Sequence, residues 1–192
     1  MCLYPVVTRK WLSISALIFS KTEPIKRRLT SVPGSGAIAV ALDKISGATV
    51  TAVEIDETAF SYLETNVKEN NSSVKPVMAD ALKICDTFAD GGLDLIVSNP
   101  PYIKSADIET LQKEVQLEPR LALDGGEDGC DFYREIVNRW SRKLKKGGAL
   151  AFELGEGQAD AVKALMTDKG FSDFKISLDF GGVQRAIIGT LL

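Results

Sequence analysis

The sequence predicts an α/β fold in which a mostly parallel β-sheet is covered by helices on both faces. From Gly34 onward, apolar runs of strand length alternate with segments that have the spacing of amphipathic helices. This alternation implies crossover connections, which make successive strands parallel. The last two strand-like runs are joined by a short glycine turn. That turn predicts an antiparallel pair at the end of the chain.

Length and composition limit the protein to one ordinary globular domain. A chain of 192 residues with 45% hydrophobic content can fill a single core. The formal net charge of -3 argues against a broad electrostatic grip on nucleic acid. The chain has no histidine, which excludes a histidine base or a histidine-ligated metal. Cys2, Cys85 and Cys130 are widely spaced and are typical of reduced thiols in a cytosolic protein.

The first half of the pattern alternates strands with two helices. Gly47 is placed to end the first helix. The second helix has an acidic first turn and three apolar residues, Phe60, Leu63 and Val67, on one face. The last run is apolar enough for a strand that is buried on both faces. In order, these elements are a helix over 34–47, a strand over 48–55, a helix over 56–71, and strands over 74–80 and 93–99.

The second half repeats the alternation and ends in the antiparallel pair. Its first helix has basic residues in the last turn and glycines beyond it, which are signals for a helix end. Gly170 is placed to end the second helix. In order, the elements are a helix over 130–148, a strand over 149–154, a helix over 156–170, and strands over 174–180 and 184–192.

Glycines and acids gather where this fold has its ligand crevice, at the carboxyl ends of the strands. Gly34 and Gly36 precede a helix N-terminus, where free amides and a positive dipole end can face a carboxylate. Glu54 ends the next strand, where a carboxylate can accept hydrogen bonds from both ribose hydroxyls. Asp80 ends the strand after that and can accept a hydrogen bond from an adenine amino group.

Each of these residues also has a simpler interpretation. The glycines alone are typical of a tight turn, a single acid at a strand end is commonly solvated, and Asp80 can be an N-cap. The three features occur in order and on successive elements, which favours a site for an adenosine-containing cofactor. The antiparallel ending, and the absence of a further phosphate loop or lysine motif, favour S-adenosylmethionine over NAD or ATP.

Residues 98–102, "SNPPY", follow the most apolar strand. Pro100 and Pro101 lack a backbone N–H and have a fixed φ, so the carbonyls near them are rigid and available as acceptors. Asn99 adds a side-chain oxygen acceptor. Such acceptors can hold a substrate –NH2 group and aim its nitrogen lone pair at an electrophilic methyl group, with Tyr102 against the planar group. Positioning of this kind recovers about 7 kcal/mol or more of a barrier. The alternative is a Pro-Pro turn that is merely capped by asparagine.

With this motif the chain resembles the amino-methyltransferases that carry N-P-P-Y. Within that class it resembles the peptide chain release factor glutamine methyltransferases. The closer resemblance depends on "EPRLALDGGEDGCDFYREI" (118–136), "FELGEGQ" (152–158) and "GFSDFKISLDFGGVQRAIIG" (170–189), which occur in the family's order. It covers about residues 34–192. It implies a Rossmann-like class I methyltransferase fold, with a mostly parallel seven-stranded sheet, an antiparallel last strand and helices on both faces.

The resemblance implies that S-adenosylmethionine methylates the side-chain amide nitrogen of a glutamine in the Gly-Gly-Gln loop of a release factor. Asn99, Pro100 and Tyr102 are the catalytic candidates, since the first two would hold the amide and Tyr102 would flank it. Pro101 completes the substrate site. The release factor is the expected partner, no metal is expected, and we expect a monomeric cytoplasmic enzyme that does not enter a membrane. The cofactor-binding candidates are Gly34, Ser35, Gly36, Glu54, Asp80 and Asn99.

The amino-terminal part departs from the family pattern in two ways. The helical amino-terminal domain of the family has no counterpart, so the chain resembles the catalytic domain only. The family's cofactor loop reads "DLGTGSG", whereas residues 30–36 read "TSVPGSG". Val32 puts a branched side chain where backbone must approach the ligand, and Pro33 removes an amide donor. This change predicts weak or absent cofactor binding.

A shifted reading frame would explain the altered loop. With suitable synonymous codons, "PVVTRKW" (5–11) and "LTSVP" (29–33) yield R-R-H-T-E-V and D-L-G-T in one shifted frame. The family has P-R-x-x-T-E and D-L-G-T at these places. The hypothesis divides the chain into a degenerate segment over 1–33 and a methyltransferase domain over 34–192. The first segment is out of frame from about residue 6 and includes a damaged first strand.

Two other functions stay open. The same acceptors fit an exocyclic amine of a DNA or RNA base, and a flipped base would stack on Tyr102. The acidic balance and the lack of an additional basic segment argue against a nucleic-acid partner. The third possibility is a non-catalytic remnant of the enzyme, which the altered glycine loop favours.

Overall fold

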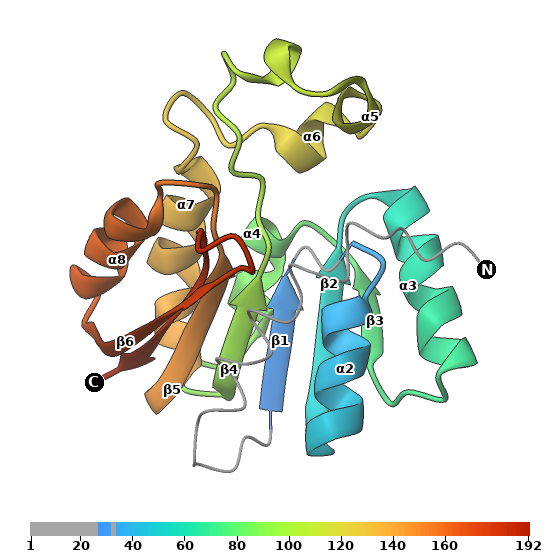
Figure 1. Ribbon diagram of the computed structural model, residues 1–192. Coiled ribbons are helices and arrows are strands. Elements are labelled where there is room, and N and C mark those ends of the chain that lie inside the picture. The colour runs from blue at the N-terminus through green and yellow to red at the C-terminus, as the bar shows by residue number, and fades with distance from the viewer. Residues whose placement is uncertain (1–26, 32–33) are drawn as a thin grey trace.

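The computed structural model describes residues 27–31 and 34–192 (Figure 1). These residues form one twisted sheet with strand order β3-β2-β1-β4-β5-β7-β6. β7 is antiparallel to both of its neighbours, and the other neighbouring strands are parallel. The final hairpin therefore forms as the glycine turn predicts. The strands are β1 (Arg27–Ser31), β2 (Thr49–Glu54), β3 (Lys75–Met78), β4 (Leu93–Ser98), β5 (Leu144–Glu153), β6 (Phe171–Leu178) and β7 (Gln184–Leu191).

Helices cover both faces of the sheet, as the alternation predicts. On β4, Ile96 belongs to one buried cluster, while Leu95 and Val97 belong to another on the opposite face. Residues of α2 and α3 pack in the second cluster, and residues of α4, α7 and α8 pack in the first. The helices are α2 (Ala37–Ser46), α3 (Glu57–Glu69), α4 (Ala81–Ile84), α5 (Lys113–Gln116), α6 (Arg120–Leu123), α7 (Asp131–Trp140) and α8 (Ala159–Thr167), with 3-10 turns at Cys85–Thr87, Ile108–Thr110 and Ser141–Lys143.

The helix expected over 130–148 is shorter than predicted. α7 ends at Trp140, and β5 already begins at Leu144. Leu144 is buried and pairs with Leu93, so strand packing outweighs the helical pattern of the basic segment. The register then shifts between Leu93 and Leu95, and Gly147 takes a positive φ of 75°. These two features extend the strand through residues that sequence analysis assigned to the helix end.

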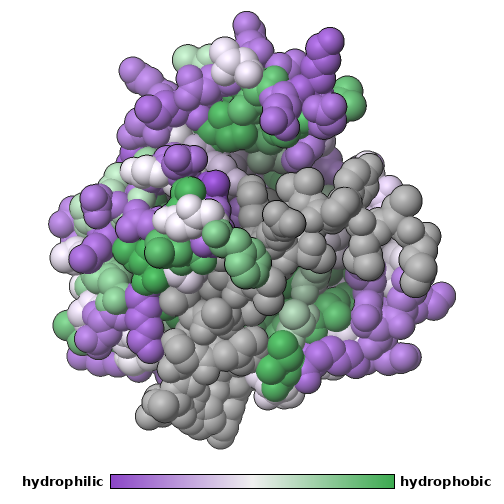
Figure 2. All heavy atoms as spheres, viewed as in Figure 1, coloured by the Kyte–Doolittle hydropathy of each residue, from purple (hydrophilic) through white to green (hydrophobic). Residues whose placement is uncertain are grey.

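Residues 99–130 form a long excursion between β4 and α7. It carries α5 and α6 and projects beyond the carboxyl edge of the sheet, at the top of Figure 1. Sequence analysis predicted no elements here. In Figure 2, hydrophobic surface lies between the polar outer part of this lobe and the body of the molecule. Within the described residues, no helix is long and apolar enough to cross a membrane, and no group of acids and cysteines has the arrangement of a metal site.

A buried carboxylate ties α2 to the segment before β3. Asp43 is 8% exposed and accepts hydrogen bonds from the Ser72 hydroxyl at 2.6 Å and the Ser73 amide at 2.9 Å. Burial raises the pKa of the Asp43 carboxyl, but the hydrogen bonds from Ser72 and Ser73 outweigh it, so the pKa lies below its ordinary value. The ionised carboxylate therefore stabilises the folded state above the ordinary aspartate pKa.

We expect Asp43→Asn to lower the free energy of unfolding at pH 7 by about 1–3 kcal/mol, because hydrogen bonds to a charged acceptor are lost. The folded-state pKa is depressed, so this contribution is complete above about pH 4 and disappears as the pH falls further. Urea unfolding at pH 7, 5 and 3 measures it. Glu64→Gln, at an exposed position on α3, is the control and should change stability little. An Asp43→Asn penalty of equal size at pH 3 and pH 7 would contradict the electrostatic explanation.

Candidate active site

The sheet register places the expected polar residues along one edge. Ser31 of β1 pairs with Val53 on one side and with Ser98 on the other. Glu54 and Asn99 each lie one residue beyond these partners, so they occupy the same row. Strands are about 4.8 Å apart, which puts the Cα atoms of Glu54 and Asn99 about 10 Å apart across β1. The crevice is expected at the carboxyl edge of the sheet. Glu54 and Asn99 lie there on either side of β1, so they flank the middle of the crevice.

The glycine loop leads into the N-terminus of α2. Gly34 and Gly36 have positive φ angles of 52° and 75°. A Cβ atom at Gly36 would lie 2.2 Å from Leu63 Cδ1, whereas one at Gly34 would meet no described residue within 4 Å. The carbonyl of Ser35 accepts a hydrogen bond of 2.8 Å from Asn66 Nδ2 on α3. Gly36 is therefore required by conformation and by packing, and Gly34 by conformation alone. Val32 and Pro33 lie outside the described residues.

Glu54 is 3% exposed, and backbone amides hold its carboxylate. Its Oε1 accepts hydrogen bonds from the amides of Ile55 (2.8 Å) and Asp56 (2.9 Å). Its Oε2 accepts one from Gly34, twenty residues earlier, at 3.0 Å. A carboxylate has about four acceptor positions, so one on Oε2 remains beyond these three bonds. Glu54 thus connects the glycine loop to β2 and can still accept a hydroxyl donor.

Asp80 begins α4 as its N-cap, which is the simpler of the two roles considered for it. Its Oδ1 accepts a 2.8 Å hydrogen bond from the Leu82 amide, and its Oδ2 lies 3.2 Å from Lys83 Nζ. Asp80 also lines a cavity of about 180 Å³. The cavity wall is otherwise apolar, which suits a flat heterocycle with a polar group at its edge. The lining residues are Val53, Ile55, Ala79, Asp80, Ala81, Leu82, Pro101, Leu121, Phe132 and Ile136.

Asn99 presents a buried acceptor that has no partner within the described residues. Its Oδ1 atom is buried and accepts no hydrogen bond. A buried carbonyl oxygen without a donor costs about 1–3 kcal/mol, so such an atom points to a ligand that supplies one. Pro100 and Pro101, next in the chain, are both buried. Pro101 lines the cavity, whereas Asn99 is not among the lining residues. The acceptor and the cavity are therefore adjacent parts of one edge.

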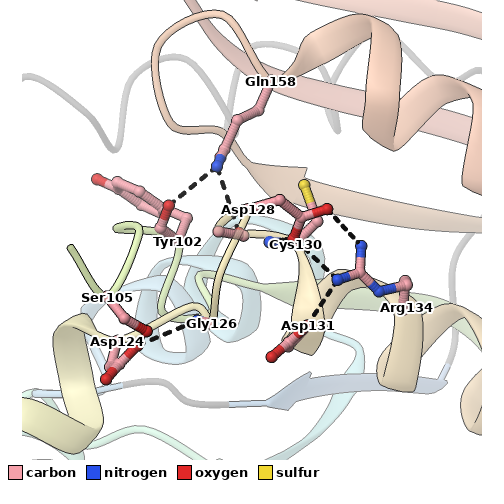
Figure 3. A network of polar contacts seen from close by, with 10 residues as sticks. Tyr102, Ser105, Asp124, Gly126, Asp128, Cys130, Asp131, Arg134 and Gln158 are labelled. Carbon is pink, nitrogen blue, oxygen red and sulfur yellow. Dashed lines mark hydrogen bonds and ion pairs between the residues drawn. The ribbon is translucent and has the colours of Figure 1, made fainter. Parts of the chain in front are cut away.

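Tyr102 is half-buried and is held by side chains from two other segments. Its hydroxyl donates to Glu153 Oε1 at 3.4 Å, and its carbonyl accepts from Gln158 Nε2 at 2.9 Å. The next amide, that of Ile103, donates to the Leu123 carbonyl at 2.9 Å. The turn is therefore packed against the end of the excursion, which carries the glycine-rich residues before α7 (Figure 3).

Sequence analysis missed two polar residues that contact this turn. Glu153 is buried at the end of β5, opposite the position of Asn99, since Ser98 pairs with Phe152. It follows an apolar strand just as Glu54 does, so the same signal would have found it. Gln158 lies in the quoted block 152–158 but received no role. Its contact with Tyr102 joins residues 56 positions apart, which no local pattern shows.

The geometry agrees with a family match. The family model described as methyltransferase small domain matches residues 21–127, which is more than half of the chain. The chain belongs to the methyltransferase small domain family. A solved methyltransferase from Pyrococcus furiosus is 26% identical, with a TM-score of 0.68, over 92% of this chain and 81% of that one. The Rossmann-like methyltransferase fold expected from the sequence is thus confirmed for this methyltransferase domain.

Curated relatives of this methyltransferase domain share one name. The release factor glutamine methyltransferase of Geobacter sulfurreducens is 42% identical over 160 residues, which are 82% of this chain and 55% of the relative. The protein of the same name from Bradyrhizobium diazoefficiens is 41% identical over 161 residues, which are 80% of this chain and 52% of the relative. The chain thus spans about half the length of the curated relatives it matches.

Proposed function

We propose that this domain uses S-adenosylmethionine to methylate the side-chain amide nitrogen of a glutamine in a peptide chain release factor, within its Gly-Gly-Gln loop. One observation carries the proposal: the buried Oδ1 of Asn99 lacks a donor among the described residues. A primary carboxamide supplies N–H donors for such an acceptor. The shared name of the curated relatives supports this choice of substrate.

The substrate side of the site acts by positioning. Asn99 Oδ1 and the carbonyl of Pro100 would each accept one N–H of the glutamine amide, and Tyr102 would lie against its plane. Pro100 and Pro101 have no N–H of their own to compete for these acceptors. Two acceptors fix the plane and direction of the amide, and such alignment recovers about 7 kcal/mol or more of a barrier. The chain has no histidine, so alignment takes the place of a histidine base.

The cofactor side has groups that fit S-adenosylmethionine. The glycine-loop amides at the N-terminus of α2 suit its carboxylate, Glu54 Oε2 keeps an acceptor position for a ribose hydroxyl, and the apolar cavity beside Asp80 suits adenine. When bound, the cofactor supplies an electrophilic methyl group on a sulfonium. The residues proposed to bind it are Gly34, Ser35, Gly36, Glu54, Asp80 and Asn99.

The chain as written should bind this cofactor weakly, because Val32 is branched and Pro33 lacks an amide donor. Replacing both, as Val32→Gly with Pro33→Thr, is expected to tighten binding by about tenfold or more, since one amide donor returns and a steric obstacle is removed. Isothermal titration with S-adenosylmethionine measures the two dissociation constants. Equal constants for the two chains, or micromolar binding by the chain as written, would contradict the prediction.

We also propose that residues 1–33 are the degenerate segment and 34–192 the methyltransferase domain. Residues 1–26 lie outside the described part of the chain. β1 (Arg27–Ser31) belongs to the first segment and pairs with both β2 and β4. Five residues of that segment thus serve as a central strand, whatever reading frame encoded them. The nucleotide sequence of codons 1–40 tests the frameshift hypothesis. If its codons do not yield R-R-H-T-E-V and D-L-G-T in the shifted frame, the hypothesis is rejected.

The function is tested by offering two substrates with methyl-labelled cofactor. One reaction contains a release factor, the other total RNA, and each is run with the chain as written and with the Val32→Gly, Pro33→Thr chain. We expect label on the glutamine of the Gly-Gly-Gln loop. We also expect the protein to act as a monomer. Label on RNA instead would favour transfer to an exocyclic amine. Label on neither substrate with either chain would favour a non-catalytic remnant.

A further inference from the structure

Gln158 stands at the N-terminus of α8, but its side chain is used elsewhere. It is the N-cap residue of that helix and makes no side-chain capping bond. Its amide instead reaches across to the turn that follows β4, as Figure 3 shows. Glutamine is not among the side chains that favour an N-cap. A local role in starting α8 therefore does not explain this residue.

The Gln158 amide makes three hydrogen bonds and one longer polar contact. Nε2 donates to the carbonyl of Tyr102 at 2.9 Å and to that of Gly129 at 3.3 Å. Oε1 accepts from the Gly155 amide at 3.1 Å and lies 3.4 Å from the Tyr133 hydroxyl oxygen. A primary amide offers two donors and two lone pairs. The side chain thus joins the turn after β4, the loop before α7, α7 itself and the end of β5.

Two glycines make room for this amide. A Cβ atom at Gly129 would lie 2.6 Å from Gln158 Nε2, and one at Gly155 would lie 2.4 Å from Oε1. The same Cβ at Gly155 would lie 2.9 Å from Tyr102 Cδ2. Both glycines therefore let backbone approach the amide and the tyrosine ring closely. Tyr133, which is fully buried, donates its hydroxyl proton to the Glu153 carbonyl at 2.8 Å, and this bond fixes its ring beside the amide.

The turn needs such an external tether. Pro100 and Pro101 have no N–H, so two consecutive residues beside Asn99 cannot donate backbone hydrogen bonds to hold their own conformation. We propose that Gln158 is a positioning residue of this site: by holding the Tyr102 carbonyl, it fixes the turn that carries the Asn99 and Pro100 acceptors. The inference rests on the proposed function for its effect on catalysis. Its effect on the turn is independent of substrate.

The test uses Gln158→Met, which keeps the length of the side chain but removes both donors and the acceptor. Gln116→Leu is the matched control, because Gln116 Nε2 also bridges two carbonyls, those of Glu109 and Leu111, but on α5. Hydrogen exchange is followed at the Ile103 and Gly125 amides, which bond to the Leu123 and Ile103 carbonyls. The amide of Phe60, bonded to the Asp56 carbonyl on the other face of the sheet, reports on stability away from this turn.

In Gln158→Met we expect exchange at Ile103 and Gly125 to accelerate about tenfold or more, with Phe60 unchanged. In the Val32→Gly, Pro33→Thr chain at saturating cofactor, kcat on the release factor should fall by about tenfold, because the acceptors lose their fixed geometry. The dissociation constant of the cofactor should stay within about twofold. Gln116→Leu should change none of these values.

Unchanged exchange at Ile103 and Gly125 would overturn the tether. Equal acceleration at Phe60 would also overturn it, by showing a general loss of stability. If exchange accelerates locally but kcat holds, Gln158 secures the turn without serving catalysis, and the positioning role is rejected. Failure of the proposed function looks different. Neither the wild type nor any variant would then label the release factor, and the exchange data alone would decide whether Gln158 holds the turn.

Discussion

Replacing Asn99 with alanine is expected to lower kcat for glutamine methylation by about 100-fold or more, as the loss of a preorganised polar contact does in other active sites. Stability should not fall with it. Asn99 Oδ1 accepts no hydrogen bond within the described residues, so the substitution breaks none there. It removes a buried, unpaired carbonyl instead, which is unfavourable by about 1–3 kcal/mol. The variant should therefore unfold at the same denaturant concentration as the wild type or a higher one.

Steady-state rates at saturating cofactor, in the Val32→Gly, Pro33→Thr chain, and urea unfolding measure the two effects. Asn138→Ala, at an exposed position on α7, is the control and should change neither. Asn99→Asp adds a second comparison, because it keeps one oxygen acceptor but places a charge at a half-buried position. We expect it to be less stable than the wild type. An Asn99→Ala protein that keeps full kcat would reject the acceptor role, and with it the observation on which the proposed function depends.

Gly36→Ala is expected to destabilise the fold by about 3 kcal/mol or more, the sum of a left-handed backbone penalty and an overpacked core. Gly36 has a φ of 75°, and a Cβ there would lie 2.2 Å from Leu63 Cδ1 and 3.4 Å from Leu63 Cα. Leu63 is fully buried in the cluster beneath α2. Its side chain can move away only by displacing close-packed neighbours.

Gly34→Ala is the matched comparison for Gly36→Ala. Gly34 also has a positive φ, of 52°, but an added Cβ meets nothing within 4 Å among residues 27–31 and 34–192. Only the backbone penalty of about 1–2 kcal/mol applies there. Urea unfolding of both variants gives the difference, which measures the packing contribution of the loop apart from any ligand. Equal losses for the two variants would show that contact with Leu63 does not constrain the loop.

Sequence analysis predicted the elements that have strong local signals and erred where packing overrode them. The amphipathic helix α3 and the buried strand β4 lie close to their expected positions, because apolar spacing within one segment specifies each. The segment from Leu144 to Gly148 was assigned to a helix end but lies in β5. Pairing between Leu144 and Leu93 decides that outcome, and Leu93 is 51 positions away. The excursion that carries α5 and α6 has no strong periodicity and was not predicted.

The candidate site also combines features that the local sequence specifies with features that only the fold specifies. The glycines precede a helix start, and the acids and the Asn-Pro-Pro-Tyr motif stand at strand ends. These placements depend on local order along the chain, so the sequence by itself determined them. Only the tertiary structure decided their states: Glu54 accepts from Gly34, Asp80 caps α4, Asn99 Oδ1 has no donor in the described part of the chain, and Gln158 holds Tyr102. The Asp80 cap is local. The other three states depend on strand register and on distances between segments that lie far apart in the chain, because hydrogen bonds form or fail within a few tenths of an ångström.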